Sequence, residues 1–88
     1  MKISINVIGL GFVGLTTALG FSEKKFDTVF VENNKAKFDK IQKGKIPFKE
    51  PFLDKILKRN IKKKNISFSS KPKILKNNTN VIFICVGT

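Results

Sequence analysis

The sequence contains few of the residues that would point to a secreted or membrane-spanning protein. Its single cysteine, Cys85, excludes an internal disulfide, and its position inside an apolar run favours a reducing compartment. No apolar run approaches the roughly 20 residues that cross a bilayer. No cleavage-like site follows the N-terminus. We therefore expect a cytoplasmic protein with no membrane partner.

The absence of tryptophan and tyrosine is offset by nine phenylalanines, and 41% of the 88 residues are hydrophobic. This content supports an ordinary packed core and argues against disorder. No internal repeat and no low-complexity tract occurs. A chain of this length forms one domain at most and buries only roughly 60 to 70% of its unfolded surface, so we expect a thin margin of stability.

Acidic residues are also scarce. The sequence has 6 acidic and 18 basic residues, and its formal net charge is +12. This imbalance raises the possibility of a small nucleic-acid-binding module, with the strongest charge run at residues 58–64 as its binding surface. A compositional bias is the alternative, because Lys, Asn, Ile and Phe all have A/T-rich codons. All basic residues except Arg59 are lysines, whereas nucleic-acid-binding surfaces normally include several arginines, so nucleic acid is not the expected partner.

The first third of the chain has the pattern of a strand, a helix and a second strand. Residues 2–8 are mostly apolar and end at Gly9, residues 12–24 have helical periodicity, and residues 28–31 are β-branched and aromatic. We expect the helix to bury one face, made of Val13, Thr17, Ala18 and Phe21.

Two further helices are predicted in the middle of the chain. Asn33 or Asn34 is placed to cap the first of them, and Gly44 is placed to end it. Pro51 suits the first turn of the next helix, which carries Leu53, Ile56 and Leu57 on one side.

The last third predicts two more strands. Residues 66–69 alternate like a short edge strand, and Ser70 with Pro72 is expected to open one or two helical turns that reach about residue 76. Residues 81–86 are continuously apolar, which is typical of a parallel strand covered on both faces. The alternation of strands and helices predicts an α/β fold with a parallel sheet and right-handed crossovers.

Gly9, Gly11 and Gly14 have the spacing Gly-x-Gly-x-x-Gly, and the motif lies between the first strand and the first helix. In a strand-helix-strand unit of about 30 residues this motif indicates dinucleotide binding. The first glycine permits the tight turn, the second allows close approach of a pyrophosphate, and the third allows the helix to pack on the strand. The N-terminus of the helix, at Phe12 and Val13, supplies unpaired N–H groups.

Glu32 follows the second strand, 18 residues after Gly14, where a carboxylate accepts hydrogen bonds from the adenosine ribose. A carboxylate at this position repels a 2′-phosphate and favours NAD over NADP. Lys35 and Lys37 stand nearby and are able to screen a phosphate, which leaves NADP as the alternative.

Three stretches of the chain resemble the UDP-glucose/GDP-mannose dehydrogenase family, at the start of its NAD-binding domain. They are VIGLGFVGL at residues 7–15, KGKIPFKEP at residues 43–51 and IFICVGT at residues 82–88. The resemblance implies a partial Rossmann fold over residues 1–88, with a parallel sheet of about four strands in the order 3-2-1-4. It also implies NAD as the cofactor, with Glu32 on the adenosine ribose, Lys37 beside it and Thr88 approaching from the end of the fourth strand.

Some positions depart from the family pattern. Phe12 replaces the usual tyrosine, Glu32 replaces the usual aspartate, and Phe52 stands where glycine commonly occurs. None of these changes removes the backbone geometry that binds a dinucleotide, although Phe12 and Phe52 alter the fine placement of a ligand.

The resemblance further implies an amino-terminal fragment of a UDP-glucose 6-dehydrogenase-like oxidoreductase without its substrate-binding domain. Family members oxidise a nucleotide sugar in two NAD-dependent steps through a thioester on a later cysteine. Cys85 belongs to the fourth-strand motif and is expected to be buried, so it does not replace that cysteine. We therefore expect NAD binding without turnover, and self-association through an open sheet edge. UDP-glucose is preferred over GDP-mannose and UDP-N-acetylmannosamine as the sugar nucleotide. A separately encoded remainder of the enzyme, acting in trans, is a further hypothesis.

Overall fold

A computed structural model describes residues 2–48 and 50–86 of the chain. Within these residues the elements follow the order β1 (Lys2–Ile8), α1 (Phe12–Glu23), β2 (Asp27–Val31), α2 (Lys35–Gln42), α3 (Pro51–Lys63), β3 (Ile66–Ser69) and β4 (Asn78–Ile84). All strand pairs are parallel, and the sheet has the order β3-β2-β1-β4. The predicted fold class and strand order are confirmed.

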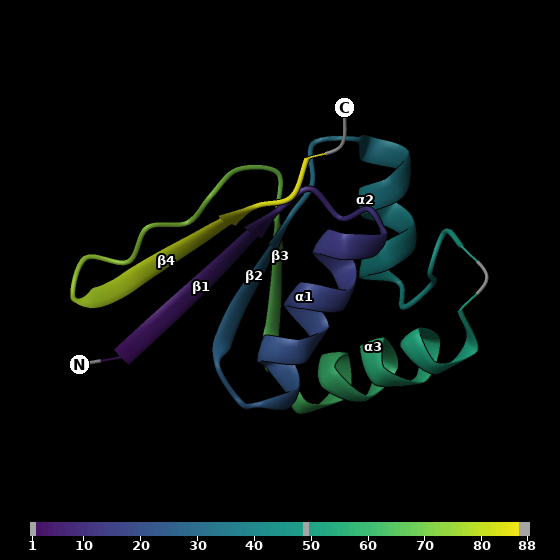
Figure 1. Ribbon diagram of the computed structural model, residues 1–88, viewed down its shortest axis with the longest axis horizontal. Helices are drawn as coiled ribbons and strands as arrows, with labels where there is room; N and C mark the ends of the chain where they lie inside the picture. The colour runs from purple at the N-terminus through teal and green to yellow at the C-terminus, as the bar shows by residue number, and fades with distance from the viewer. Residues whose placement is uncertain (1, 49, 87–88) are drawn as a thin grey trace.

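The helices lie on one side of the sheet (Figure 1). Alternate residues of β1 point to that side, so Ile5 and Val7 are buried there with Phe30 of β2, which pairs with Val7. Each helix contributes apolar residues to the same core, namely Leu15, Ala18 and Leu19 from α1, Ile41 from α2 and Leu57 from α3. One continuous core therefore holds the sheet and its helices together.

The predicted buried face of α1 is confirmed at Ala18, and Phe21 packs against the core, but Val13 does not belong to this face. Val13 is 65% exposed, whereas Gly14, Leu15, Ala18, Leu19 and Ser22 are buried. The buried positions follow the three- and four-residue spacing set by Gly14, which packs against the backbone of the preceding turn. Val13 precedes Gly14 by one residue, so it is rotated by about 100° away from the sheet.

The predicted helix ends are confirmed. Asn34, rather than Asn33, caps α2, because its side-chain oxygen accepts a hydrogen bond of 3.0 Å from the Lys37 N–H. Gly44 has φ +85 and its N–H donates to the Ile41 carbonyl at 2.9 Å, which ends the helix. Pro51 occupies the first turn of α3.

The helical turns predicted after Ser70 are wrong. Residues 70–77, here called the crossover strap, contain no helix and run over the side of the sheet opposite the helices (Figure 1). The buried Asn6 side chain holds the strap with two hydrogen bonds, accepting from the Lys73 N–H at 2.8 Å and donating to the Lys73 carbonyl at 2.9 Å. Asn80 makes the same pair of bonds to Leu75. Side-chain amides thus satisfy backbone groups that a helix would otherwise pair.

The burial predicted for the last strand also needs correction. β4 starts at Asn78 and ends at Ile84, and its face on the strap side is open, with Ile84 72% exposed. The strap lacks a helix and leaves this end of the sheet bare. Cys85 lies just beyond the strand and is only partly buried, packed against the core from the helix side.

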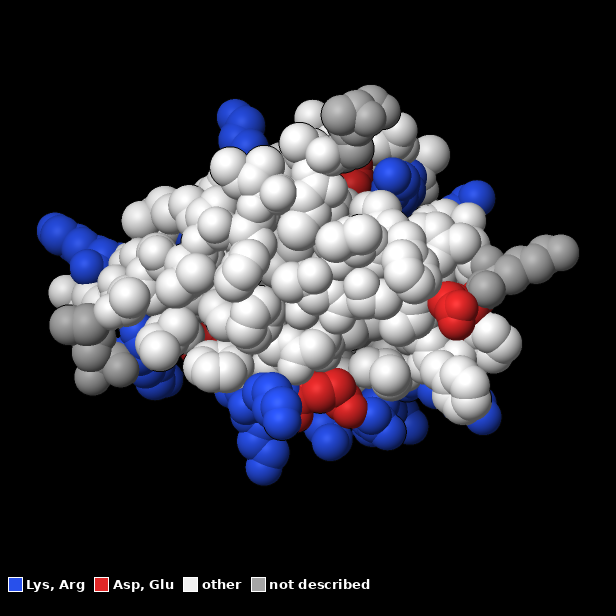
Figure 2. Space-filling view, in the orientation of Figure 1, with Lys and Arg blue, Asp and Glu red and all other residues white. Residues whose placement is uncertain are grey.

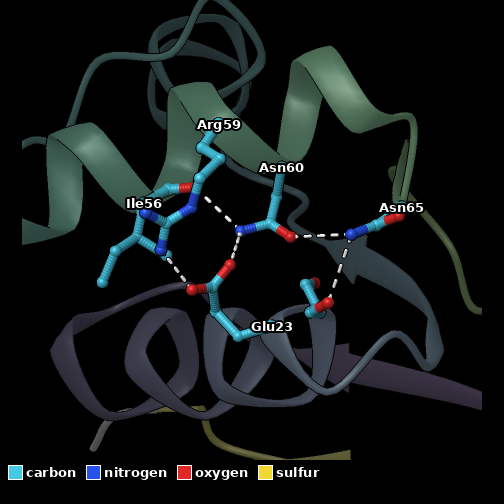
Figure 3. A network of polar contacts seen from close by, with 6 residues as sticks. Glu23, Ile56, Arg59, Asn60 and Asn65 are labelled. Atoms are coloured by element: carbon cyan, nitrogen blue, oxygen red, sulfur yellow. Dashed lines mark hydrogen bonds and ion pairs between the residues drawn. The ribbon is translucent and has the colours of Figure 1, made fainter.

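A polar network joins the end of α1 to the last turns of α3 (Figure 3). The Glu23 carboxylate accepts hydrogen bonds from the Arg59 guanidinium and, at 2.7 Å, from the Asn60 amide. Asn60 is fully buried and accepts in turn from the Asn65 amide at 2.9 Å. Arg59, a member of the basic run, is therefore engaged in a fold contact.

The network predicts a pH dependence of stability. Hydrogen bonds from Asn60 and Arg59 hold the pKa of the Glu23 carboxyl below its ordinary value. A lowered pKa in the folded state stabilises the fold above the unfolded-state pKa, and this contribution is lost as the pH falls through the folded-state pKa. At pH 7, the Glu23→Gln variant is expected to melt at a lower temperature than the wild type. In thermal melts from pH 7 down to pH 3, this difference in melting temperature is expected to shrink as the pH falls. The exposed Asp27 provides the control variant Asp27→Asn, and an equal pH profile for the two variants would contradict the prediction.

No helix within residues 2–48 and 50–86 is both long and apolar enough to span a membrane.

Candidate functional site

The candidate site lies where the carboxyl ends of the central strands meet the N-terminus of α1 (Figure 1). Two backbone bonds extend the sheet past its strands at this edge, from the Gly9 N–H to the Val31 carbonyl at 2.9 Å and from the Cys85 N–H to the Ile8 carbonyl at 2.8 Å. A cavity of about 570 Å³ opens there between the glycine turn, the end of β2 and the crossover strap. Ligands of open parallel sheets bind at this kind of crevice.

The three glycines differ in how much space their surroundings leave for a side chain. Gly9 has φ +92, and a Cβ there would lie 3.0 Å from the Cys85 backbone. A Cβ on Gly14 would lie 1.7 Å from the Gly9 carbonyl oxygen, so only glycine lets α1 pack this closely. Gly11 lines the cavity, and a Cβ there would meet nothing within 4 Å. The fold thus requires Gly9 and Gly14, whereas Gly11 keeps space open.

The first turn of α1 provides the hydrogen-bond donors of the site. Gly11 is the N-cap and has no side chain to cap the helix, and the first bond of the helix runs from the Leu15 N–H to the Gly11 carbonyl at 2.9 Å. The N–H groups of Phe12, Val13 and Gly14 precede that bond and have no acceptor within the helix. A helix N-terminus of this kind favours an anion such as a pyrophosphate.

The side chains of Phe12 and Val13 do not line the cavity. Phe12 is 55% exposed and packs edge-to-face on Phe48, with 5.8 Å between ring centroids. Val13 points to solvent, as described above. The predicted contribution of these two residues is therefore available through their backbone only.

Glu32 is buried at the end of β2, with 7% of its surface exposed, and it borders the cavity. One carboxylate oxygen accepts from the Leu10 N–H at 2.8 Å and the other from the Asn34 N–H at 3.0 Å. Glu32 therefore fastens the glycine turn to the loop before α2. Each oxygen keeps a second lone pair that is suited to a ribose hydroxyl.

Lys37, which the family resemblance places beside Glu32, also lines the cavity, and Thr88 lies outside the described residues. Asn33 also lines the cavity, although it was not predicted as a site residue. The start of the strap, likewise unpredicted, contributes Ser70, Lys71 and Pro72 to the lining. Their position after the carboxyl ends of β2 and β3 was the signal that could have found them. Among the described residues, no group of three or more Cys, Asp or Glu side chains is arranged to hold a metal ion.

A larger groove of about 720 Å³ lies between the end of α2 and the last turns of α3. It is bordered by basic side chains, namely Lys43, Lys58, Arg59, Lys62 and Lys63. Figure 2 shows Lys and Arg side chains gathered along the lower edge of the visible face, remote from the glycine turn. Two of these cations, Lys62 and Lys63, lie in the last turn of α3, where positive charge is stabilising without a ligand.

Comparison with known proteins agrees with this geometry. The family model for the UDP-glucose/GDP-mannose dehydrogenase family, NAD binding domain, matches residues 1–88. UDP-glucose 6-dehydrogenase from Rhizobium meliloti is 34% identical over 84 residues, which are 96% of this chain and 19% of that protein. In a ternary complex of GDP-mannose dehydrogenase from Pseudomonas aeruginosa, the matching region covers all of this chain and 20% of that one, with 35% identity and a TM-score of 0.81.

UDP-D-ManNAc dehydrogenase from Pyrococcus horikoshii has a TM-score of 0.83 and 32% identity, over 94% of this chain and 20% of that one. The chain thus spans about a fifth of the length of these relatives. Its strand order, glycine turn and full-length match to the family model agree with one another. The chain belongs to the UDP-glucose/GDP-mannose dehydrogenase family and corresponds to the amino-terminal part of its Rossmann-like NAD-binding domain.

Proposed function

We propose that the chain binds the adenosine-diphosphate half of NAD through its glycine turn and Glu32, and that residues 1–88 alone do not oxidise a nucleotide sugar. The observation that carries the proposal is the open space at Gly11, which faces the cavity and has no packing role. Side-chain packing does not require glycine at this position, whereas a close-lying pyrophosphate does.

Each part of the site has a defined task in this proposal. The N–H groups at the start of α1 receive the pyrophosphate, and the lone pairs of Glu32 receive the ribose hydroxyls. Lys37 lies at the rim and attracts the anionic ligand. NAD supplies a hydride acceptor when it is bound.

Oxidation of a sugar nucleotide needs groups that residues 1–88 do not supply. The relatives compared above are about five times longer than this chain, and their names include UDP-glucose, GDP-mannose or UDP-D-ManNAc. We propose UDP-glucose as the substrate of a complete enzyme whose substrate-binding part is joined to this domain or supplied in trans. The single cysteine supports a reducing, cytoplasmic setting.

Calorimetric titration with NAD, followed by NMR of the labelled protein, tests this function. We expect weak binding with shifts centred on residues 9–14 and Glu32. No heat and no shifts there would refute the binding proposal. Reduction of NAD by the purified 88-residue protein with UDP-glucose would refute the claim that it lacks turnover.

The basic groove favours a second candidate, which is binding of a nucleic-acid backbone. Five cations border one groove, and only Arg59 among them is paired with a described acid. Such binding would weaken steeply with salt and would survive substitution of Gly11 and Glu32. An affinity for single-stranded DNA without that salt dependence would rule it out.

The free edge of β4 predicts self-association. This strand, NTNVIFI, has no lysine or proline in a chain with 18 basic residues, and natural edge strands are commonly protected by those two residue types. We expect Ile84→Lys, on the open face, to weaken a dimer by about tenfold, because each new dimer would bury two charges. Sedimentation equilibrium measures this. Lys76→Met is the control in the strap, and wild-type protein that stays monomeric at high concentration would contradict the prediction.

A further inference from the structure

The crossover strap begins next to the backbone of Glu32. The Glu32 N–H donates to the Ser69 carbonyl at 3.0 Å, which joins the end of β2 to the end of β3. The Ser69 hydroxyl accepts from the Lys71 N–H at 3.1 Å and donates to the Lys71 carbonyl, so the chain is fixed directly after β3. Residues 70–72 line the same cavity as Glu32. The start of the strap is therefore a wall of the candidate site.

Asn6 of β1 fastens the far end of this wall to the sheet. Its side chain is fully buried, accepts from the Lys73 N–H at 2.8 Å and donates to the Lys73 carbonyl at 2.9 Å. Within residues 2–48 and 50–86, no other hydrogen bond holds residues 72–74. An extended segment without such bonds would sample many conformations. Asn6 therefore sets the position of the wall, although it does not line the cavity itself.

The order of the strand ends indicates which part of a ligand meets the strap. The sheet has the order β3-β2-β1, and these strands end at the strap, at Glu32 and at the glycine turn, respectively. In the proposed function the pyrophosphate lies at the glycine turn and the ribose at Glu32. A ribose carries its base on C1′, away from the phosphate on C5′. The strap is therefore placed to meet the adenine base, and Pro72 gives this wall an exposed apolar ring.

We propose that Asn6 is a positioning residue of the nucleotide site, and that it holds residues 70–72 in place as the wall for the adenine base. The proposal rests on dinucleotide binding at the glycine turn, and it adds a residue that acts on the ligand through the strap. Because the wall is ordered before the ligand arrives, binding of the base does not have to order it. Loss of Asn6 therefore weakens ligands that carry adenosine more than ligands that consist of phosphate alone.

NMR titrations of the labelled protein with ADP and with inorganic pyrophosphate test the positioning role. In the wild type, we expect both ligands to shift the amide signals of residues 9–14 and only ADP to shift those of Ser70 and Lys71. Asn6→Leu removes both bonds to the strap and is expected to weaken ADP by about tenfold and pyrophosphate by less than about threefold.

Asn80→Leu is the matched control. Asn80 makes the same pair of bonds to the strap at Leu75, which does not line this cavity. We expect this variant to leave the ratio of the ADP and pyrophosphate affinities unchanged. If Asn6→Leu does not fold, Ser69→Ala replaces it, because it releases Lys71 alone, and it is expected to weaken ADP by about threefold with pyrophosphate unchanged.

The two ligands separate this proposal from the one it rests on. ADP that shifts residues 9–14 but neither Ser70 nor Lys71 would overturn the positioning role and leave the proposed function intact. Equal losses of ADP and pyrophosphate affinity in Asn6→Leu would also overturn it, since Asn6 would then serve the fold only. Binding of neither ligand to the wild type would overturn both proposals.

Discussion

Gly14→Ala is expected to abolish detectable NAD binding and to lower the free energy of unfolding by about 3 kcal/mol or more. The added methyl group would lie 1.7 Å from the Gly9 carbonyl oxygen and 2.9 Å from the Gly9 carbonyl carbon. Both contacts are with backbone atoms, so no side-chain rotation relieves them. Either α1 moves away from β1 or the glycine turn is displaced, and each movement disrupts the pyrophosphate site.

Gly20→Ala is the matched control, because Gly20 lies in the same helix and a Cβ there would meet nothing within 4 Å. This variant is expected to gain about 0.5 to 1 kcal/mol, the usual difference between glycine and alanine inside a helix. Thermal melts with urea titrations measure both changes. A Gly14→Ala protein that melts within about 3 °C of the wild type would contradict the close packing, since 1 kcal/mol corresponds to roughly 4 to 8 °C in a domain of this size.

Glu32→Ala is the second change with a large expected effect. It removes the acceptors of two N–H groups, those of Leu10 and Asn34, and the Leu10 bond is buried. Leaving a buried donor unpaired costs about 1 to 3 kcal/mol, so we expect a loss of stability in that range. We also expect NAD affinity to fall by at least about tenfold, because the ribose loses its acceptor and the glycine turn loses its anchor.

Two further variants separate these contributions. Glu32→Gln keeps the volume and one acceptor oxygen, so it is expected to recover about half of the lost stability while NAD binding stays weak. Asp39→Ala, at a partly exposed acid of α2, is expected to change stability by less than about 0.5 kcal/mol. If Glu32→Ala bound NAD as tightly as the wild type, the assignment of Glu32 to the site would be wrong.

The sequence predicted the structure best at positions where a local backbone conformation requires one particular residue type. The spacing of three glycines between a strand and a helix predicts a turn at Gly9, an open space at Gly11 and a close packing contact at Gly14. The structure contains all three features. The positions of Gly44 and Pro51 likewise identify helix ends through local backbone chemistry. Strand order followed from the family pattern that these local signals revealed.

The crossover strap could not be predicted in the same way. Its conformation depends on Asn6, which lies 67 residues away from Lys73 and shows no pairing signal in the sequence. Ser70 and Pro72 suit a helix start locally, but the side-chain bonds of Asn6 and Asn80 satisfy the strap in an extended form. The missing helix in turn exposes β4 and brings Lys71 to the cavity. A long-range contact from Asn6 and a local one from Asn80 thus explain why the helix predicted after Ser70 is absent.

The face of α1 illustrates a different limit. Helical periodicity allows several faces when apolar residues are spread around the helix, and α1 has apolar residues on most sides. The steric demand at Gly14 selects the buried face, and hydrophobicity alone does not report it.

The most direct test of the site is an NAD titration of Gly11→Val against the wild type, with stability measured on the same samples. The new side chain would point into open space, so we expect unfolding free energy to change by no more than about 1 kcal/mol, the cost of a poorer N-cap. NAD affinity is expected to fall by at least about tenfold, because the side chain occupies the pyrophosphate position. A Gly11→Val protein that binds NAD as tightly as the wild type would contradict the account.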